Sequence, residues 1–270
     1  MIGQKRIKYR IKQLIDIDCF PSFIILIAPR GYGKRTLAKF IANELKAYYA
    51  SCGAKVDDVR EVIDTAYKAT EKCFYCIENG DLMRNEAKNA MLKITEEPPK
   101  NAYFCLNVTD EKFLLDTIKS RGMVFHLDEY TQKEIEEYYE FKKDVLDSSA
   151  ISSNLLQIAK CPGDLNFLSE YGDDFINYVR LVIDNIAEVE PANAFKSSYK
   201  LALKNNAGYD LDLFFRAFCW ECINRIKEDP LRYAQGIIVT SPFAVQAVQP
   251  GVNKQQLYDM WVFKIREVWL

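Results

Sequence analysis

A glycine-rich segment near the N-terminus has the residue types that hold phosphate groups. Residues 28–36 read APRGYGKRT and lie between the apolar run FIILIA and a stretch whose apolar residues recur every three or four positions. A glycine-rich turn between a buried strand and a helix presents backbone N–H groups to phosphate oxygens, and the helix N-terminus adds positive potential. Gly31, Gly33 and Lys34 supply this arrangement, so the segment predicts phosphate binding.

The segment departs from the full phosphate-loop pattern, GxxxxGK followed by Ser or Thr. Ala28 replaces the first glycine, and Arg35 replaces the hydroxyl residue that ligates Mg²⁺. Thr36 is a further cofactor-binding candidate, but it comes one position after the missing hydroxyl residue. Because a helix rotates successive residues by about 100°, Thr36 is poorly placed to ligate Mg²⁺ in its stead. The alternative interpretation is a structural turn that has lost its nucleotide.

The other reactive side chains do not predict a second site. His126 is the only histidine, which excludes a catalytic triad or a His-rich metal site and favours a core or edge-strand role. Among the eight cysteines, the spacing of Cys73 and Cys76 on an expected strand puts their side chains on opposite faces. Cys219 and Cys222 fall on an apolar helix, where packing is the expected role. We therefore predict no metal site.

Alternating apolar strands and amphipathic helices predict an α/β fold with a parallel sheet. The expected strands are FIILIA, KCFYCI, AYFCLNV and VFHL, and the expected helices span residues 4–15, 37–50, 56–69 and 85–93, with a short element at 117–121. After about residue 130, helical spacing dominates. The exceptions are a short strand-like run, GIIVT, and an expected loop, SPFAVQAVQPG, before a final helix at 253–269.

Composition limits the function classes. The 36 Lys and Arg nearly balance the 38 Asp and Glu, for a net charge of −2, so any DNA contact must be local. One basic run could face DNA on a helix, but a solvated, partner-facing helix surface is the expected role: Lys5, Arg6, Lys8, Arg10 and Lys12. No stretch approaches the roughly 20 apolar residues that cross a bilayer, and the first residues lack a signal-peptide core. We expect a cytoplasmic protein that does not contact membranes.

Three blocks of sequence carry a family resemblance. APRGYGKRTLAKFIA, NAMLKITEEPP and TIKSRG occur in the order and spacing seen in the gamma and delta-prime subunits of bacterial DNA polymerase III clamp loaders, which are AAA+ proteins. The matches cover residues 22 to about 168, and the C-terminal hundred residues resemble the family's helical collar only loosely. The resemblance implies an AAA+ α/β nucleotide-binding-like domain at 1–129, a small helical lid at 130–171 and a helical collar for oligomerisation at 172–270.

The resemblance also implies that the hydrolysis machinery is weakened. Glu78 and Asn79 stand where the family has an Asp that serves Mg²⁺ and a Glu that polarises water, and an asparagine cannot act as a general base. Thr109 stands near the sensor-1 position and keeps a hydroxyl. Asn166 stands where an arginine would reach the γ-phosphate. Together with Arg35, the changes at positions 78, 79 and 166 argue against ATP turnover.

Arg121 is retained by contrast. In the family, the arginine of Ser-Arg-Cys reaches the ATP of the adjacent subunit, and residues 120–122 here read Ser-Arg-Gly. The resemblance therefore implies an arginine finger that acts in trans. A helix-end salt bridge is the alternative role for this side chain.

The expected protein is a delta-prime-like clamp-loader subunit. It would join other clamp-loader subunits in a hetero-oligomeric ring that loads a sliding clamp onto primer–template DNA. By the same resemblance Arg84 and Lys88 are DNA-contact candidates, although a solvated helix face would explain them equally well. ATP binding would be weak and Mg²⁺-independent or absent, and no zinc is expected because only Cys52 stands where the family has its zinc module.

Two alternatives remain open from the sequence. One is an active ATPase motor subunit of a reduced or phage-type clamp loader, in which Glu78 alone holds the metal. The other is a scaffold protein that binds no nucleotide and only joins partners.

Overall fold

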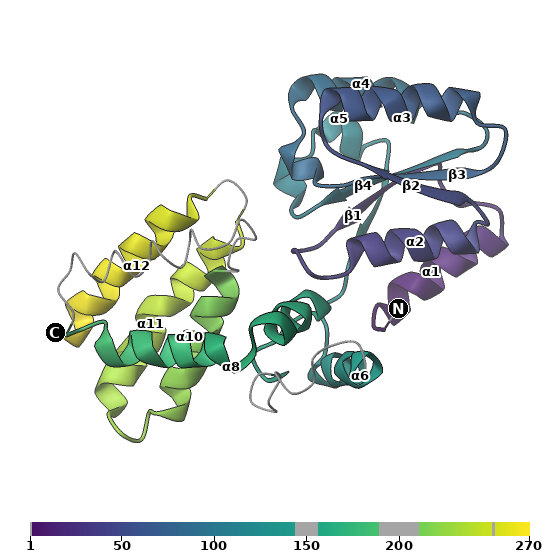
Figure 1. Cartoon of the computed structure of the whole chain (residues 1–270). Coiled ribbons are helices and arrows are strands. Elements are labelled where there is room, and N and C mark those ends of the chain that lie inside the picture. Colours follow the sequence, from purple (N-terminus) through teal and green to yellow (C-terminus); the bar gives the residue numbers. More distant parts are fainter. Residues whose placement is uncertain (1, 144–155, 189–210, 250–251) are drawn as a thin grey trace. The chain divides into compact units, whose positions relative to one another are not determined.

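The computed structural model describes residues 2–143, 156–188, 211–249 and 252–270 (Figure 1). They form two compact units. The first contains residues 1–138 and 161–163, and the second contains residues 139–160 and 164–270. The three-domain division at 129 and 171 stays a prediction, and one long helix, α8 (Pro162–Asn185), runs through the second of these positions.

A five-stranded, all-parallel sheet forms the centre of the first unit, which confirms the predicted α/β fold. The strand order is β2-β3-β4-β1-β5. The strands are β1 (Phe23–Ile27), β2 (Tyr48–Cys52), β3 (Cys73–Ile77), β4 (Ala102–Val108) and β5 (Met123–His126). Every residue of β1 is buried because this strand lies between β4 and β5 with helices on both faces, which explains its unbroken apolar run.

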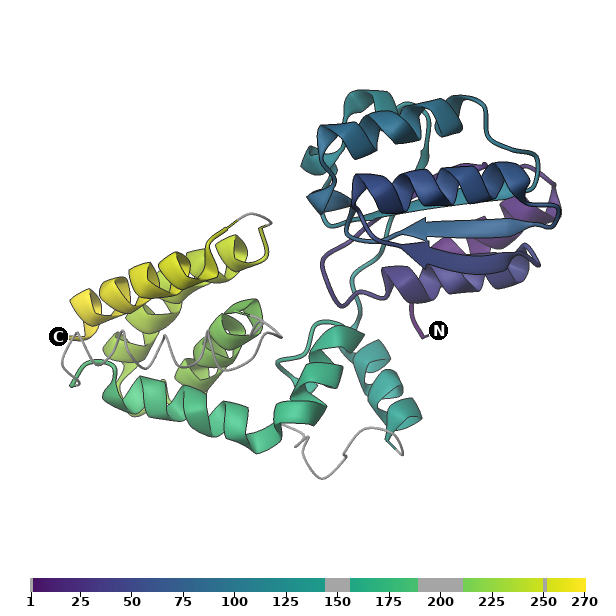
Figure 2. The same ribbon diagram turned by 45° about the horizontal axis from the view of Figure 1, so that its top comes forward.

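The helices of the first unit cover the two faces of the sheet (Figure 1). One face carries α1 (Lys5–Asp16) and α2 (Lys34–Glu44), and the other carries α3 (Val56–Lys68), α4 (Asn85–Glu96) and α5 (Asp116–Lys119). Figure 2 shows the same two layers from a second angle. Short 3₁₀ turns, η1 (Gly80–Leu82) and η2 (Glu111–Phe113), follow β3 and β4.

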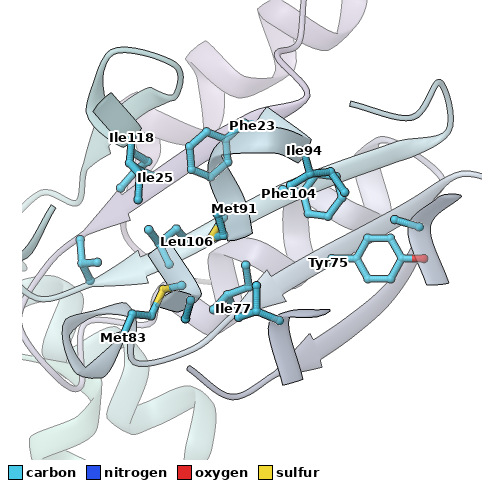
Figure 3. Close-up of a cluster of buried hydrophobic side chains, with 14 of the residues drawn as sticks. Phe23, Ile25, Tyr75, Ile77, Met83, Met91, Ile94, Phe104, Leu106 and Ile118 are labelled. Carbon is cyan, nitrogen blue, oxygen red and sulfur yellow. The ribbon is translucent and has the colours of Figure 1, made fainter. Parts of the chain in front are cut away.

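Side chains alternate between the two faces along each strand, as the two-residue period of a strand requires. Phe23 and Ile25 point into the core under α3, α4 and α5, where they meet Phe104 and Leu106 of β4 (Figure 3). Ile24 of β1 belongs to the opposite core under α1 and α2. The same alternation places Cys73 and Cys76 in opposite cores, as predicted.

Strand β2 was not predicted, because its residues continue the apolar pattern of the preceding helix. The structure ends α2 at Glu44, four residues before β2 begins. Lys46 takes the left-handed conformation (φ 54°), and the N–H groups of Lys46 and Ala47 donate to the carbonyls of Asn43 and Ala42. This helix-ending motif usually contains glycine at the left-handed position. The lysine there removes the usual sequence signal for the end of the helix.

The second unit is helical. Its principal helices are α8, α10 (Leu211–Asn224), α11 (Pro230–Ala247) and α12 (Lys254–Trp269), and α6 (Gln132–Lys142) joins the first unit to the second. Trp261 of α12 is fully buried, and its ring packs on Phe214, Phe215 and Phe218 of α10 with centroids 4.9–5.4 Å apart. Its indole N–H donates to Thr240 Oγ1 of α11 at 2.9 Å, which satisfies the buried polar group.

The expected strand-like run GIIVT and loop SPFAVQAVQPG are wrong in large part, because α11 continues through them to Ala247. The helix contains Pro242. Because α11 packs against both α10 and α12, this packing outweighs the low helix propensity of the β-branched residues and of the proline. A helix-start signal was present in the sequence. Asp229 caps the first turn by accepting from the N–H of Arg232 at 3.0 Å, and Pro230 occupies the first helical position.

A buried ion-pair network holds α10 of the second unit to the start of α8. Arg216 is largely buried and contacts Asp212 at 2.9 Å and Asp164 at 3.0 Å. It also donates to the Ile158 carbonyl at 2.5 Å. Burial by itself lowers the pKa of Arg216, but the two aspartates outweigh that effect and raise its pKa above the ordinary value. Among the described residues, none of the helices has the length and hydropathy needed to span a bilayer.

We predict that Arg216→Ala lowers the free energy of unfolding of the second unit by about 3 kcal/mol, because it removes the buried cation that neutralises the carboxylates of Asp164 and Asp212. Trp220, Trp261 and Trp269 are the only tryptophans and all lie in this unit, so their fluorescence during urea unfolding measures the change. Lys264→Ala is the control, since Lys264 forms an exposed pair with Glu267 and its removal should cost less than about 0.5 kcal/mol. Equal losses in the two variants would contradict the prediction.

Candidate functional site

The predicted phosphate loop lies between β1 and α2, at the carboxyl edge of the sheet. Gly31 and Gly33 both have positive φ angles, 82° and 83°, which only glycine adopts without strain. Gly33 is the N-cap of α2, and Lys34 is the first helical residue. The loop therefore has its glycines where the backbone needs them, and it leads directly into a helix N-terminus, as predicted.

Lys34 folds back on the loop that precedes it. Its ammonium donates to the carbonyls of Ala28 at 2.5 Å and Pro29 at 2.9 Å. Burial lowers the pKa of Lys34 to about 8; the nearby carboxylate of Asp81 opposes this shift and the positive charge of Arg30 adds to it. The lysine thus stabilises the loop through the loop's own carbonyls.

Groups from distant parts of the first unit bind the next three carbonyls of the loop. The bonds are Cys161 Sγ to Arg30 O at 3.8 Å, Gly163 N to Gly31 O at 3.1 Å, and Tyr130 Oη to Tyr32 O at 3.0 Å. With the two bonds of Lys34, five consecutive carbonyl oxygens accept hydrogen bonds, and none of these five bonds uses an N–H group of the loop. The loop is therefore held from outside through its carbonyls.

Two glycines let residues 161–163 approach the loop closely. A Cβ on Gly163 would lie 2.4 Å from the Cα of Gly31, and a Cβ on Gly31 would lie 2.7 Å from the sulfur of Cys161. Both distances are shorter than any stable contact between such atoms. The contact was not predicted from the sequence, because it joins residues about 130 positions apart, although a glycine at a helix start was visible in CPGDL.

The segment after β5 is tied to the same region. The Gln4 side chain is almost fully buried; its Nε2 donates to Asp128 O at 2.7 Å, and its Oε1 accepts from Asp128 N at 2.8 Å. Two residues further on, the ring of Tyr130 packs so closely on Gly3 that a Cβ there would lie 2.5 Å from it. The ring of Tyr130 also meets the Tyr32 ring edge-on. The exit from β5 therefore contacts both the N-terminal residues and the loop.

Arg35 and Glu78 form an ion pair in the region where the family resemblance implies Mg²⁺. Arg35 Nε lies 2.9 Å from Glu78 Oε1, in the geometry of an ion pair rather than of an aligned hydrogen bond. Arg35 Nη2 also approaches Ser51 Oγ at 3.4 Å. A guanidinium cannot ligate a metal, and here it neutralises the carboxylate that would. These residues do not fit Mg²⁺, and Thr36 is exposed on the first turn of α2.

The remaining predicted positions of the site follow β3 and β4. Asn79 takes the left-handed conformation (φ 56°), which asparagine tolerates better than most residues, and its carbonyl accepts from Leu82 N. Thr109 donates its backbone N–H to Asp81 Oδ1 at 2.7 Å, and its hydroxyl oxygen is buried with no hydrogen-bond partner among the described residues. Asn166 lies in α8 of the second unit, so its relation to the loop stays a prediction.

Arg121 has partners within its own chain. Its Nη2 lies 2.5 Å from Glu96 Oε1 at the end of α4, and its Nη1 donates to Thr117 O at 2.7 Å. These are the contacts of the helix-end salt bridge that was the alternative interpretation. About one-third of the side chain is exposed, and the finger role stays a prediction.

The two DNA-contact candidates differ in their surroundings. Arg84 is exposed at the start of α4, whereas Lys88 is partly buried and donates to Phe113 O at 2.7 Å. His126 is exposed on the edge strand β5, with Nε2 2.8 Å from Glu111 Oε1. Within the described ranges, no cluster of three or more His, Cys, Asp or Glu side chains could hold a metal ion.

We predict that Gly31→Ala weakens the loop, at a cost of about 1–2 kcal/mol from the left-handed backbone alone. Hydrogen–deuterium exchange over residues 22–45 should rise in this variant. The control is Gly53→Ala, whose φ is not positive and whose new Cβ would meet only the movable carboxylate of Asp58. Equal exchange in both variants would show that the backbone of Gly31 does not limit the loop.

We predict a pH dependence of stability from Lys34. Its folded-state pKa of about 8 lies below the ordinary 10.5 of the unfolded chain, so between these values the unfolded state binds more protons. The contribution of Lys34 to stability should therefore rise as pH increases from about 8 to 10.5. Urea unfolding of wild type and Lys34→Met across this range measures it, and a rise of the same size in Lys34→Met would contradict the assignment.

Sequence comparisons point to one functional group of proteins. A family model described as "DNA polymerase III, delta subunit" matches residues 50–131. The DNA polymerase III subunit gamma of Buchnera aphidicola is 27% identical over 177 residues, which cover 54% of this chain and 48% of the relative. The tau/gamma subunit of Haemophilus influenzae is 36% identical over 169 residues, which cover 51% and 25%. The chain thus spans between a quarter and about half of these two relatives.

Solved structures share the fold. A DNA polymerase III gamma subunit-related protein of Thermotoga maritima matches with a TM-score of 0.51 and 16% identity, over 97% of this chain and 99% of that protein. The RuvB Holliday junction branch migration motor of Thermotoga maritima matches with a TM-score of 0.54 and 19% identity, over 96% and 85%. The chain is thus similar in sequence to subunits of DNA polymerase III, and it shares its fold with these two solved structures.

Proposed function

We propose that this protein is a delta-prime-like subunit of a clamp loader. It would act in the cytoplasm in a hetero-oligomeric ring that loads a sliding clamp onto primer–template DNA, with its helical second unit joining it to other subunits. The matched relatives bear the names of DNA polymerase III subunits, which supports the replication role.

The ion pair between Arg35 and Glu78 carries the proposal that this subunit does not hydrolyse ATP. The position that holds a metal-ligating hydroxyl in the family is a cation here, and it contacts the carboxylate at 2.9 Å. Asn79 cannot serve as a base for the attacking water. The same ion pair counts against the alternative of an active motor, because Glu78 alone would have to hold the metal while paired with Arg35.

Arg121 supports a role in the hydrolysis carried out by a neighbour. A guanidinium supplies a fixed charge and a planar set of donors, which stabilise charge on a transferring phosphoryl group. In this chain it is oriented by Glu96 and Thr117, so its side chain is already ordered before any neighbour arrives. An ordered finger loses less conformational entropy when it meets the ATP of an adjacent subunit.

We predict that Arg121→Ala lowers the DNA-stimulated ATPase rate of the reconstituted complex at least tenfold, given that such fingers are worth about 10³–10⁵ in rate. Arg121→Lys should show a large part of this loss. The measurement compares steady-state ATPase rates in complexes of equal size, and the isolated wild-type chain supplies the background rate.

Two variants test whether the effect is chemical or structural. Lys119→Ala removes a charge from the same short helix, where Lys119 pairs with Glu111, and should leave the rate unchanged. Glu96→Gln removes the partner of Arg121 and keeps the arginine. Glu96→Gln should retain more activity than Arg121→Ala, because it keeps the guanidinium and removes only a group that orients it. An unchanged rate for Arg121→Ala in an equally assembled complex would exclude the finger role.

A further inference from the structure

Positive charge is concentrated at the start of α2. Lys34 and Arg35 are its first two residues, and the first turn contains no acidic side chain. The N-terminus of a helix already carries a partial positive charge, so two cations there are unfavourable unless anions lie close by. Glu78 provides one such anion at 2.9 Å from Arg35, and Asp81 acts on Lys34. Carboxylates of the same unit therefore partly offset the positive charge at the start of α2.

A divalent cation has no place in this arrangement. It would have to compete with a guanidinium for Glu78, it would be repelled by the charges of Lys34 and Arg35, and it would find no hydroxyl at position 35. The phosphates of a nucleotide would meet the opposite conditions. The side chain of Arg35 is 58% exposed even while it contacts Glu78 and Ser51. A guanidinium binds phosphate oxygens with paired, parallel donors.

We propose that the phosphate loop binds a nucleoside polyphosphate that carries no divalent metal, with the Arg35 guanidinium supplying the positive charge that Mg²⁺ supplies in related sites. This rests on the proposed function only in assuming that the loop meets nucleotide. Because Mg²⁺ forms a complex with free ATP and ADP in solution, added Mg²⁺ should weaken binding. Glu78 would act as the counter-ion of Arg35 when the phosphates are absent, and not as a metal ligand.

The test is isothermal titration calorimetry of the full chain with ATP and ADP, once in EDTA and once in excess MgCl₂ at matched ionic strength. We expect binding in EDTA and at least severalfold weaker binding in MgCl₂. Arg35→Ala should weaken binding in EDTA by about tenfold or more, the size expected when a hydrogen bond to a charged group is lost. Glu78→Gln, which releases Arg35 from its counter-ion, should strengthen it.

Two further variants sharpen the test. Lys39→Ala removes a positive charge one turn further along α2, where Lys39 lies over the Tyr49 ring, and should leave the affinity in EDTA nearly unchanged. Arg35→Thr restores a hydroxyl and frees Glu78, so its binding should improve when Mg²⁺ is added. Thermal unfolding of each variant shows whether it is folded.

Three results would overturn the inference: binding that requires Mg²⁺ in the wild type, equal affinity in wild type and Arg35→Ala, or no binding of either nucleotide in any buffer. These outcomes are separate from a failure of the proposed function. A chain that binds no nucleotide and still enters a clamp-loading complex would disprove only the metal-free site. A chain that binds nucleotide in EDTA and joins no such complex would disprove only the replication role.

Discussion

Parallel pairing of β1 with β4 and β5 is the constraint on which the rest of the first unit depends. Carboxyl ends of parallel strands meet at one edge of a sheet. The loop with Gly31 and Gly33 follows β1, Glu78 follows β3, Thr109 follows β4, and the chain that leads toward the second unit follows β5. A shift of one residue in the pairing of a strand would turn each of its side chains to the opposite face of the sheet and would separate the residues that meet at this edge. The buried run of β1 therefore stabilises the fold and also assembles the site.

At this edge, contacts within the protein hold the phosphate loop and pair its charged side chains. Lys34 binds loop carbonyls, and Arg35 neutralises Glu78. Residues 161–163 and Tyr130 hold the outside of the loop. Five of these contacts are hydrogen bonds to the carbonyls of residues 28–32, whereas Glu78 Oε1 has only its ion pair with Arg35. The loop is therefore held in its conformation by groups of the same chain.

The sequence predicted those parts of the molecule that depend on local pattern. Buried β1, the phosphate loop and the succession of strands and helices follow from apolar periodicity and from glycine. Strand β2 was missed because Lys46 ends α2 where a glycine would have marked the end. The contact between Gly31 and Gly163 could not be predicted, since it depends on how distant segments pack. The sequence shows that positions 35 and 78 differ from the family pattern, but only the structure shows the two side chains 2.9 Å apart.

Arg35 and Arg121 both form ion pairs, but in different surroundings. Each lies within 3 Å of a carboxylate of its own chain. The partner of Arg35 is Glu78, which directly follows β3, so this pairing neutralises a carboxylate at the edge of the sheet that carries the phosphate loop. The partner of Arg121 is Glu96 at the end of α4, outside the phosphate loop, and pairing there only fixes an arginine in position. Under the proposed function, the first ion pair would keep a metal from the chain's own site, and the second would hold Arg121 in position for the site of a neighbouring subunit.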